Sequence, residues 1–429
     1  MMDSNKTWQE IVQAGSVEKY INEKLVKNGF LVTRREVDKM DAKQLKEYKE
    51  SLKKEAEEKK KLKKETWKAY KENNITYLGE GVFWKDKAYK DKFDLKNAEE
   101  RCSENELPQL DTPTQLAEAL GITIGQLRWL SFNHEAAESI HYKSFEIPKR
   151  SGGKRLIWAP KPKIKEAQHW ILHNILELLP VHGSAHGFLP ERSILTNAKP
   201  HVNSKCLIRM DIKDFFPTIT FTRVKGVFRN AGYREQIATL LALICTESPR
   251  KMIKLKEKTY YVAIGERCLP QGAPTSPALS NIVSLNMDKR LLGLSKSNGW
   301  RYTRYADDLS FSFPESKKSP EVGYILGAIK RIAEEECFEI NEKKTWVSRK
   351  GGKQSITGIT VNGKEKPRVS RELKRKLRAI THNLKQGKEL HEGESIHQII
   401  GYSSYVAMVE PKIGKKFIKE LTPFLKKDK

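Results

Sequence analysis

The sequence is poor in cysteine and has no long apolar run. Its five cysteines, in 429 residues, are scattered, odd in number and never spaced as C-x-x-C. We therefore expect neither a disulfide framework nor a zinc site, but reduced thiols. The longest apolar run, Ile237 to Cys245, is too short to cross a bilayer. No N-terminal apolar stretch resembles a secretory signal, so we expect a cytoplasmic protein without membrane contact.

Negative charge is scarce relative to positive charge. The chain has 80 Lys and Arg against 54 Asp and Glu, which gives a formal net charge of +26. An excess of this size says more about partners than about fold, and it favours polyanions, nucleic acid first. The sequence has no internal repeat, and its length suggests two or three folded units.

The first hundred residues differ in composition from the rest. Residues 38 to 64 are almost wholly Lys, Glu and helix-forming residues, with a thin apolar stripe at Leu45, Tyr48 and Leu52. This pattern predicts a solvated helix, with an RNA or protein contact as the alternative. The aromatic segment 77 to 84 predicts that part of the region packs on the main body. We expect residues 1–106 to form a basic helical N-terminal extension.

From Leu107 the sequence is typical of a globular protein. Thr112 and Thr123 each begin a capping box, which predicts two short helices under a larger domain or, alternatively, a DNA-binding helix-turn-helix. Residues 142–160 predict a strand, a glycine turn and a second strand, with basic residues at the tip. Ile237 to Cys245 predicts a buried helix, and residues from 367 onward predict basic helices.

Three aspartates lie at predicted strand ends. Asp211 closes the apolar segment 206–210, and Asp307 and Asp308 lie between two strand-like segments in 301–313. Carboxylates at a turn between buried strands are costly unless they are paired or bound to metal, although an Asp-Asp pair alone is also common in polar turns. Magnesium binds a few carboxylates plus substrate phosphates, and two such ions catalyse nucleotidyl transfer. The pattern predicts such a site.

Three motifs, in order, resemble those of reverse transcriptases. Tyr305-Ala-Asp-Asp308 resembles the Y-x-D-D box, Asp211 to Phe216 resembles the first carboxylate motif, and Leu269 to Asn281 resembles the motif between them. The resemblance implies an RNA-directed DNA polymerase that uses deoxynucleotides, with Asp211, Asp307 and Asp308 as catalytic residues that hold two Mg²⁺ ions. It further implies a nucleotide-binding set, whose members are Lys154, Arg155, Phe216 and Gln271.

Two further motifs resemble those of retron reverse transcriptases. Asn197-Ala-Lys-Pro-His201 is similar to N-A-x-x-H, and Ile356-Thr-Gly358 is similar to V-T-G, with Ile in place of Val. The resemblance covers about residues 107 to 420. It implies a cognate structured non-coding RNA, priming from the 2′-hydroxyl of an internal guanosine, a branched single-stranded DNA product (msDNA), and an effector protein in defence against phage. Asn197 and His201 are then expected to contact RNA.

The C-terminal basic helix independently suits an RNA backbone, because lysine and arginine bind phosphate by charge and shape. Its expected RNA-binding residues are Arg368, Arg371, Lys374, Arg375 and Arg378.

The expected fold is α/β, of the α+β kind. It is a right-hand polymerase with fingers and an antiparallel palm sheet in residues 107–365 and a helical thumb in residues 366–429. Two alternatives remain: another bacterial reverse transcriptase (intron-encoded, diversity-generating or of another defence type), and an inactive RNA-binding scaffold. An intron enzyme usually has a further region after the thumb. A scaffold has no need of three aspartates that repel one another. The pattern leaves the oligomeric state open.

Overall fold

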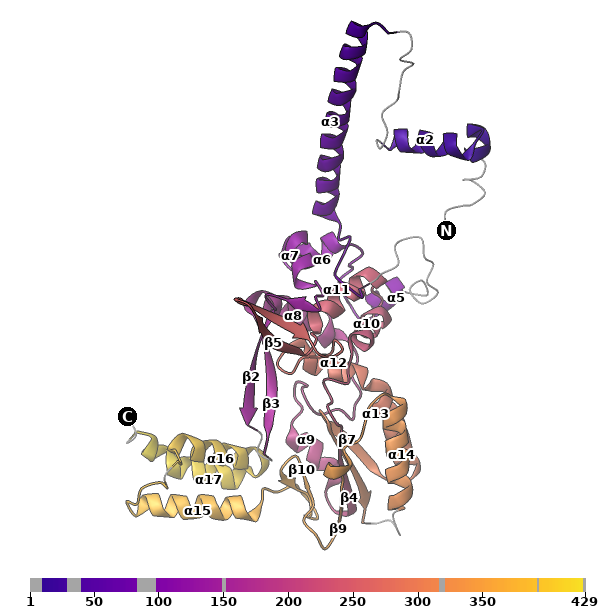
Figure 1. Ribbon diagram of the computed structural model, residues 1–429. Helices are drawn as coiled ribbons and strands as arrows, with labels where there is room; N and C mark the ends of the chain where they lie inside the picture. Colours follow the sequence, from indigo (N-terminus) through magenta and orange to yellow (C-terminus); the bar gives the residue numbers. More distant parts are fainter. Residues whose placement is uncertain are drawn as a thin grey trace.

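The protein is elongated, with a projecting helix at one end and a helical bundle at the other (Figure 1). The computed structural model describes residues 10–28, 40–82, 98–148, 152–315, 321–391 and 393–426. In these ranges, no helix combines the length and apolar character needed to cross a membrane.

The N-terminal third begins with helices. They are α2 (Val17–Lys27), α3 (Ala42–Asn73), α5 (Ala98–Glu104), α6 (Pro113–Ala119) and α7 (Ile124–Leu130). The side chains of Thr112 and Thr123 each accept a hydrogen bond from the backbone N–H three residues on. The side chains of Gln115 and Gln126 in turn accept one from the backbone N–H of Thr112 and Thr123, so both predicted capping boxes are confirmed. Helix α3 begins with a third box at Asp41 and projects from the body (Figure 1).

The segment after α3 packs on the main body, as its aromatic composition predicted. Ile75, Leu78 and Val82 are buried in the main hydrophobic cluster. The Leu78 carbonyl accepts a hydrogen bond of 2.8 Å from the backbone N–H of Asn133. Residues 83 and 84 of the predicted segment lie outside the described ranges.

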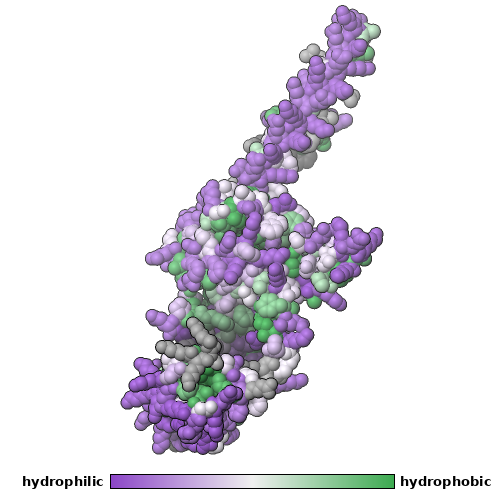
Figure 2. All heavy atoms as spheres, turned by 90° about the vertical axis from the view of Figure 1, so that its left-hand side faces the viewer, coloured by the Kyte–Doolittle hydropathy of each residue, from purple (hydrophilic) through white to green (hydrophobic). Residues whose placement is uncertain are grey.

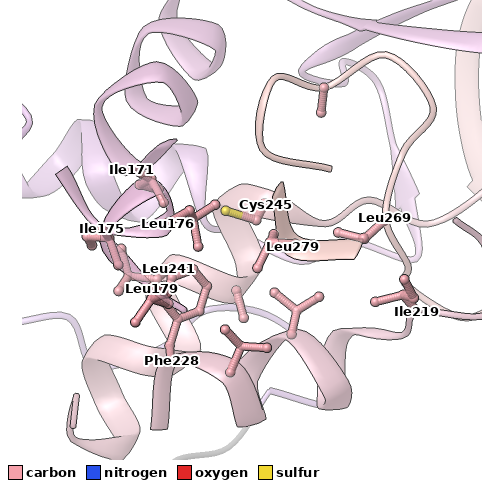
Figure 3. Close-up of a cluster of buried hydrophobic side chains, with 14 of the residues drawn as sticks. Ile171, Ile175, Leu176, Leu179, Ile219, Phe228, Leu241, Cys245, Leu269 and Leu279 are labelled. Carbon is pink, nitrogen blue, oxygen red and sulfur yellow. The ribbon is translucent and has the colours of Figure 1, made fainter. Parts of the chain in front are cut away.

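Four helices lie together in one part of the main hydrophobic cluster. These are α8 (Pro162–Asn174), α10 (Phe221–Asn230), α11 (Glu235–Cys245) and α12 (Thr275–Val283), and their apolar side chains converge in Figure 3. Every residue of α11 from Ile237 to Cys245 is buried, which confirms the predicted buried helix.

Two small antiparallel sheets flank this cluster. The predicted hairpin is confirmed as β2 (Tyr142–Pro148) and β3 (Lys154–Pro160), with Pro148 opposite Lys154. A second sheet, of order β1-β6-β5, consists of β1 (Ala136–Ala137), β5 (Arg250–Leu255) and β6 (Lys258–Ala263). This sheet was not expected from the sequence, because β5 is exposed over most of its length and lacks an alternating pattern.

The palm sheet has four antiparallel strands in the order β7-β8-β4-β9. They are β4 (Ser204–Asp211), β7 (Arg301–Tyr305), β8 (Asp308–Pro314) and β9 (Trp346–Arg349). The strand that ends on Asp211 and the two strands around Ala306–Asp307 were predicted and are confirmed. Helix α13 (Leu285–Ser297) packs on β7 and against α14 (Val322–Glu335).

Strand β4 has buried side chains on both faces. Cys206, Ile208 and Met210 belong to the main cluster, whereas Leu207 belongs to a second cluster. Because successive side chains of a strand point to opposite faces, β4 separates the two clusters. One face of the strand is therefore fully buried, whereas the face of Leu207 also carries the partly buried Lys205 and Arg209.

The second cluster joins the C-terminal helices to the palm. It includes α15 (Arg371–Lys385), α16 (Ile396–Val409) and α17 (Pro411–Leu421), together with the short hairpin of β10 (Ser355–Ile356) and β11 (Ile359–Thr360). It takes in Ile356, Ile359 and Val361, which precede the predicted thumb boundary at 366. The division into 1–106, 107–365 and 366–429 stays a prediction.

Candidate active site

The three aspartates lie at the same end of the palm sheet. Asp211 is the last residue of β4 and lies opposite Asp308, the first residue of β8. Tyr305 pairs with Asp308, which leaves a two-residue turn of Ala306 and Asp307 between β7 and β8. The backbone N–H of Ile212 donates to the Asp307 carbonyl at 3.0 Å, so the turn is joined directly to the end of β4.

A buried arginine holds the turn from behind. Arg304 is fully buried, and its guanidinium donates to both carboxylate oxygens of Asp288, with a shortest distance of 2.7 Å. It also donates to the Asn281 Oδ1 atom at 3.0 Å and to the Ala306 carbonyl at 3.1 Å. Ala306 has a φ of +56°, which is uncommon for a residue other than glycine. The arginine thus fixes the carbonyl of the strained residue next to Asp307.

A close backbone approach limits the same turn on another side. A Cβ atom at Gly187 would lie 2.7 Å from the backbone nitrogen of Ala306, so only glycine fits there. The Gly187 carbonyl accepts a hydrogen bond of 2.8 Å from Asn281, which also binds Arg304. The segment before β4 and the turn are therefore held in a single network.

Burial and mutual repulsion perturb the turn carboxylates. Burial and, after it, the charge of the neighbouring Asp307 together raise the pKa of Asp308 to about 6. Burial also raises the pKa of Asp307, with Asp211 as a further cause. Partly buried like charges favour protonation or a counter-cation, and their hard oxygen atoms suit Mg²⁺. The donor set therefore fits a divalent metal.

Lys344 neutralises one of these carboxylates. Its Nζ atom lies 3.0 Å from both oxygens of Asp211, and the Asn341 side chain donates to the same carboxylate at 3.3 Å. In the part of the chain that the structure describes, no three or more His, Cys, Asp or Glu side chains converge as a metal cluster. Lys344 and Asn341 were not expected at this site from the sequence, because they lie more than a hundred residues beyond Asp211 and belong to none of the quoted motifs.

A pocket of about 540 Å³ opens beside Asp211 and Asp307. All four predicted nucleotide-binding residues line it: Lys154, Arg155, Phe216 and Gln271. Phe188 also lines the pocket, although the sequence did not indicate it as a site residue. Its ring centroid lies 6.3 Å from that of Phe216. Asp308 is not among the lining residues. The fold thus unites residues from β3, the end of β4, the 271 loop and the β7–β8 turn.

The 271 loop and the basic hairpin are physically joined. The Gln271 carbonyl accepts a hydrogen bond of 2.7 Å from the Trp158 N–H on β3. A Cβ atom at Gly272, whose φ is +127°, would lie 2.7 Å from the Trp158 carbonyl oxygen, so this contact requires glycine. Lys154, at the start of β3, forms an exposed ion pair of 2.6 Å with Glu146 on β2. The hairpin tip, residues 149–151, lies outside the described ranges.

Asn197 and His201 lie away from the pocket and are fully buried. The two ring nitrogens of His201 bond the hydroxyls of Ser312 at 2.7 Å and Thr303 at 2.8 Å, on β8 and β7. Burial lowers the pKa of His201 to about 3, so the ring is neutral. The Asn197 amide has no hydrogen-bond partner among the described residues. Both residues brace the palm from α9 (Ile194–Ala198) and the turn after it, and direct contact with RNA stays a prediction.

The basic residues of the C-terminal helices divide into two groups. Arg371, Arg375 and Arg378 are exposed and recur at helical spacing along α15, and Arg368 is exposed just before it. Lys374 instead forms a largely buried ion pair of 2.8 Å with Glu410, which also accepts the backbone N–H of Val369. Lys374 therefore joins α15 to the start of α17, and its RNA contact stays a prediction.

Sequence comparison defines the class of this site. Residues 147–383, more than half of the chain, match the family described as reverse transcriptase (RNA-dependent DNA polymerase). The chain belongs to this family and is an RNA-directed DNA polymerase, an enzyme that acts on an RNA template and nucleotide substrates. Such enzymes use divalent metal ions.

The similar proteins narrow the class. The chain is 43% identical to the retron Mx162 reverse transcriptase of Myxococcus xanthus, over 96% of this chain and 87% of that one. It is 40% identical to the Mx65 enzyme of the same organism, over 77% and 76%, and 31% identical to the Ec86 enzyme of Escherichia coli, over 75% and 92%. Among solved structures, telomerase from Candida tropicalis has a TM-score of 0.41 at 14% identity, over 68% of this chain and 56% of that one. The protein is a retron-type reverse transcriptase.

Proposed function

We propose that the enzyme copies part of a cognate structured non-coding RNA into single-stranded DNA. Synthesis starts from the 2′-hydroxyl of an internal guanosine of that RNA and gives a branched product. The supporting observation is the pocket in which Asp211 and Asp307 face the basic start of β3 and the Gln271 loop. The pocket offers carboxylates for metal and cations for a triphosphate within one concave site.

Two Mg²⁺ ions are the proposed cofactors, held by Asp211, Asp307 and Asp308. When bound, they lower the pKa of the attacking hydroxyl and stabilise the leaving pyrophosphate. The protein contributes orientation: Lys154 and Arg155 bind the triphosphate, because cationic donors at a hairpin end suit phosphate oxygens. Phe216 excludes a ribose 2′-hydroxyl by its bulk, and Gln271 lines the nucleotide site.

The proposed RNA surface includes the exposed arginine face of α15. Arg371, Arg375 and Arg378 present cations from a rigid helix, which suits an RNA backbone read by shape. We further propose that the enzyme works in the cytoplasm with an effector protein in defence against phage. The five cysteines are free thiols, which is compatible with a reducing compartment.

Extraction of nucleic acid from cells tests the function. The gene is expressed with its upstream region, and total nucleic acid is treated with RNase and run on a denaturing gel. We expect a short, discrete single-stranded DNA that is absent with Asp307→Asn. Activity on an added RNA template and DNA primer without any such DNA would contradict the proposed priming and retain only the polymerase.

A further inference from the structure

The projecting helix α3 is a charged surface that the polymerase site does not use. It has twelve lysines and seven glutamates, and no residue of α3 is buried. Its C-terminal end meets the body, where Thr114 donates to the Asn73 carbonyl at 3.2 Å and α3 contacts α7. Figures 1 and 2 show it as a hydrophilic rod that extends clear of the body. In the part of the chain that the structure describes, packing against the body does not account for the length of α3.

The lysines of α3 are not evenly distributed around the helix. One face carries a stripe in which successive lysines are separated by three, four or seven residues, the spacing of neighbours along a single face. This lysine stripe consists of Lys46, Lys49, Lys53, Lys60, Lys64 and Lys68, all exposed. Glu50 and Glu57 interrupt it, but most of the glutamates, Glu47, Glu58, Glu65 and Glu72 among them, follow other faces. The stripe spans about 33 Å at 1.5 Å per residue.

The chemistry of the stripe suits a phosphate backbone. Lysine is a hydrated point charge that binds phosphate without the forked geometry by which arginine recognises base edges. The stripe contains no arginine, and Trp67, the aromatic residue at its edge, is stacked on Tyr70, so the stripe is suited to charge and shape rather than to sequence. A rigid row of point charges matches the regular phosphate rows of a duplex better than a flexible single strand.

Two other occupants fit less well. A membrane-bound helix needs a continuous apolar face, whereas Lys59 and Lys63 interrupt the apolar side formed by Leu52, Trp67 and Tyr70. A protein-binding helix needs the same kind of face, and its absence removes the usual source of affinity.

We propose that the lysine stripe of α3 binds the backbone of a double-stranded RNA segment. The proposal rests on the function proposed above, because the RNA is that of the enzyme's own template complex. Helix α3 then holds a duplex region of the RNA away from the catalytic pocket while another region is copied. The alignment with the Mx162 enzyme covers 96% of the chain, so it includes most of this extension.

Two matched variants of the full-length chain test the proposal. The stripe variant changes Lys53, Lys60 and Lys64 to Gln, and the control variant changes Lys54, Lys59 and Lys63, outside the stripe on the same helix, to Gln. Glutamine and lysine have similar helix propensities, so circular dichroism should be unchanged in both. The probes are an RNA hairpin of arbitrary sequence with a long stem, the same hairpin in DNA, and phosphatidylserine vesicles.

We expect the stripe variant to bind the RNA hairpin at least tenfold more weakly than the wild type. The slope of log K against log salt should fall by about 3, close to one per lost phosphate contact. The control variant should change affinity less than about threefold. Equal losses in both variants, equal affinity of the wild type for RNA and DNA hairpins, or a loss seen only with vesicles would each overturn the proposal.

Extension of a short generic primer on an RNA template separates this proposal from the proposed function. Both variants should keep the wild-type rate, because α3 lies outside the catalytic pocket. An inactive wild type would contradict the polymerase assignment without bearing on the stripe. If the wild type is active and the stripe variant binds the RNA hairpin as tightly as the wild type, the proposed role of the lysine stripe is refuted and the proposed function is not.

Discussion

At the scale of single residues, Asp307 should matter for chemistry and little for RNA affinity. Asp307→Asn removes a proposed metal ligand while it leaves the basic surfaces unchanged. We expect DNA synthesis to fall at least a thousandfold, with the affinity for RNA changed less than about twofold. Primer extension and filter binding measure the two quantities. Full activity of the variant would disprove the metal assignment.

Arg304 should contribute chiefly to stability and to the shape of the turn. Arg304→Met leaves Asp288 buried without its partner, and loss of one member of a buried pair costs about 3–5 kcal/mol of unfolding free energy. Replacing both residues, as Arg304→Met with Asp288→Leu, should cost less than the single change. Urea unfolding provides the comparison, and a double variant less stable than the single one would contradict this explanation.

Gly272 should couple the basic hairpin to the nucleotide site. A methyl group in Gly272→Ala would meet the Trp158 carbonyl at 2.7 Å and displace β3, which carries Lys154 and Arg155. We expect the KM for deoxynucleotides to rise about tenfold, with a smaller change in kcat. Gly265→Ala, where the nearest atom lies at an ordinary 3.4 Å, is the matched control and should behave as wild type.

At the scale of elements, the turn that contains His201 should make stability depend on pH. The folded state keeps His201 neutral down to a pKa of about 3, whereas the unfolded chain takes up a proton near 6.5. The contribution of His201 to the free energy of unfolding is therefore fully present above pH 6.5. Below that pH the free energy of unfolding falls by up to about 1.4 kcal/mol per pH unit. His201→Gln should reduce this slope by about one proton between pH 6.5 and 4.5, as followed by urea unfolding. An unchanged slope would contradict a neutral buried ring.

Also at this scale, local patterns explain which parts of the site could be predicted. The aspartates follow apolar strand segments, and the hairpin has its glycine turn, so both could be located from neighbouring residues. The ion pair of Lys344 with Asp211 joins residues far apart in sequence, and no periodicity signals it. Nor does any local pattern reveal that His201 is buried against two strands that begin a hundred residues later.

At the scale of the whole molecule, two described segments of the N-terminal extension differ: α3 projects from the body, whereas residues 75–82 pack on it. Removal of residues 1–72 takes away α2 and nearly all of α3, and it should leave thermal unfolding and generic primer extension unchanged. Removal of residues 1–106 also takes Ile75, Leu78 and Val82 from the main cluster, each contributing on the order of 1.5–3 kcal/mol. We expect this longer deletion to lower the melting temperature sharply. Equal stability of the two deletions would contradict the division.

The position of β4 between two hydrophobic clusters has a consequence for the order of events during synthesis. Both strand partners of β4, β8 and β9, are made long after β4 itself, and so are helices α15 to α17, which belong to the same hydrophobic cluster as Leu207. Pairings of such long sequence separation form late. A ribosome must therefore have released most of the chain before Asp211 and Asp308 can face each other, so the nascent polypeptide has no assembled catalytic centre beside the transcript that encodes it.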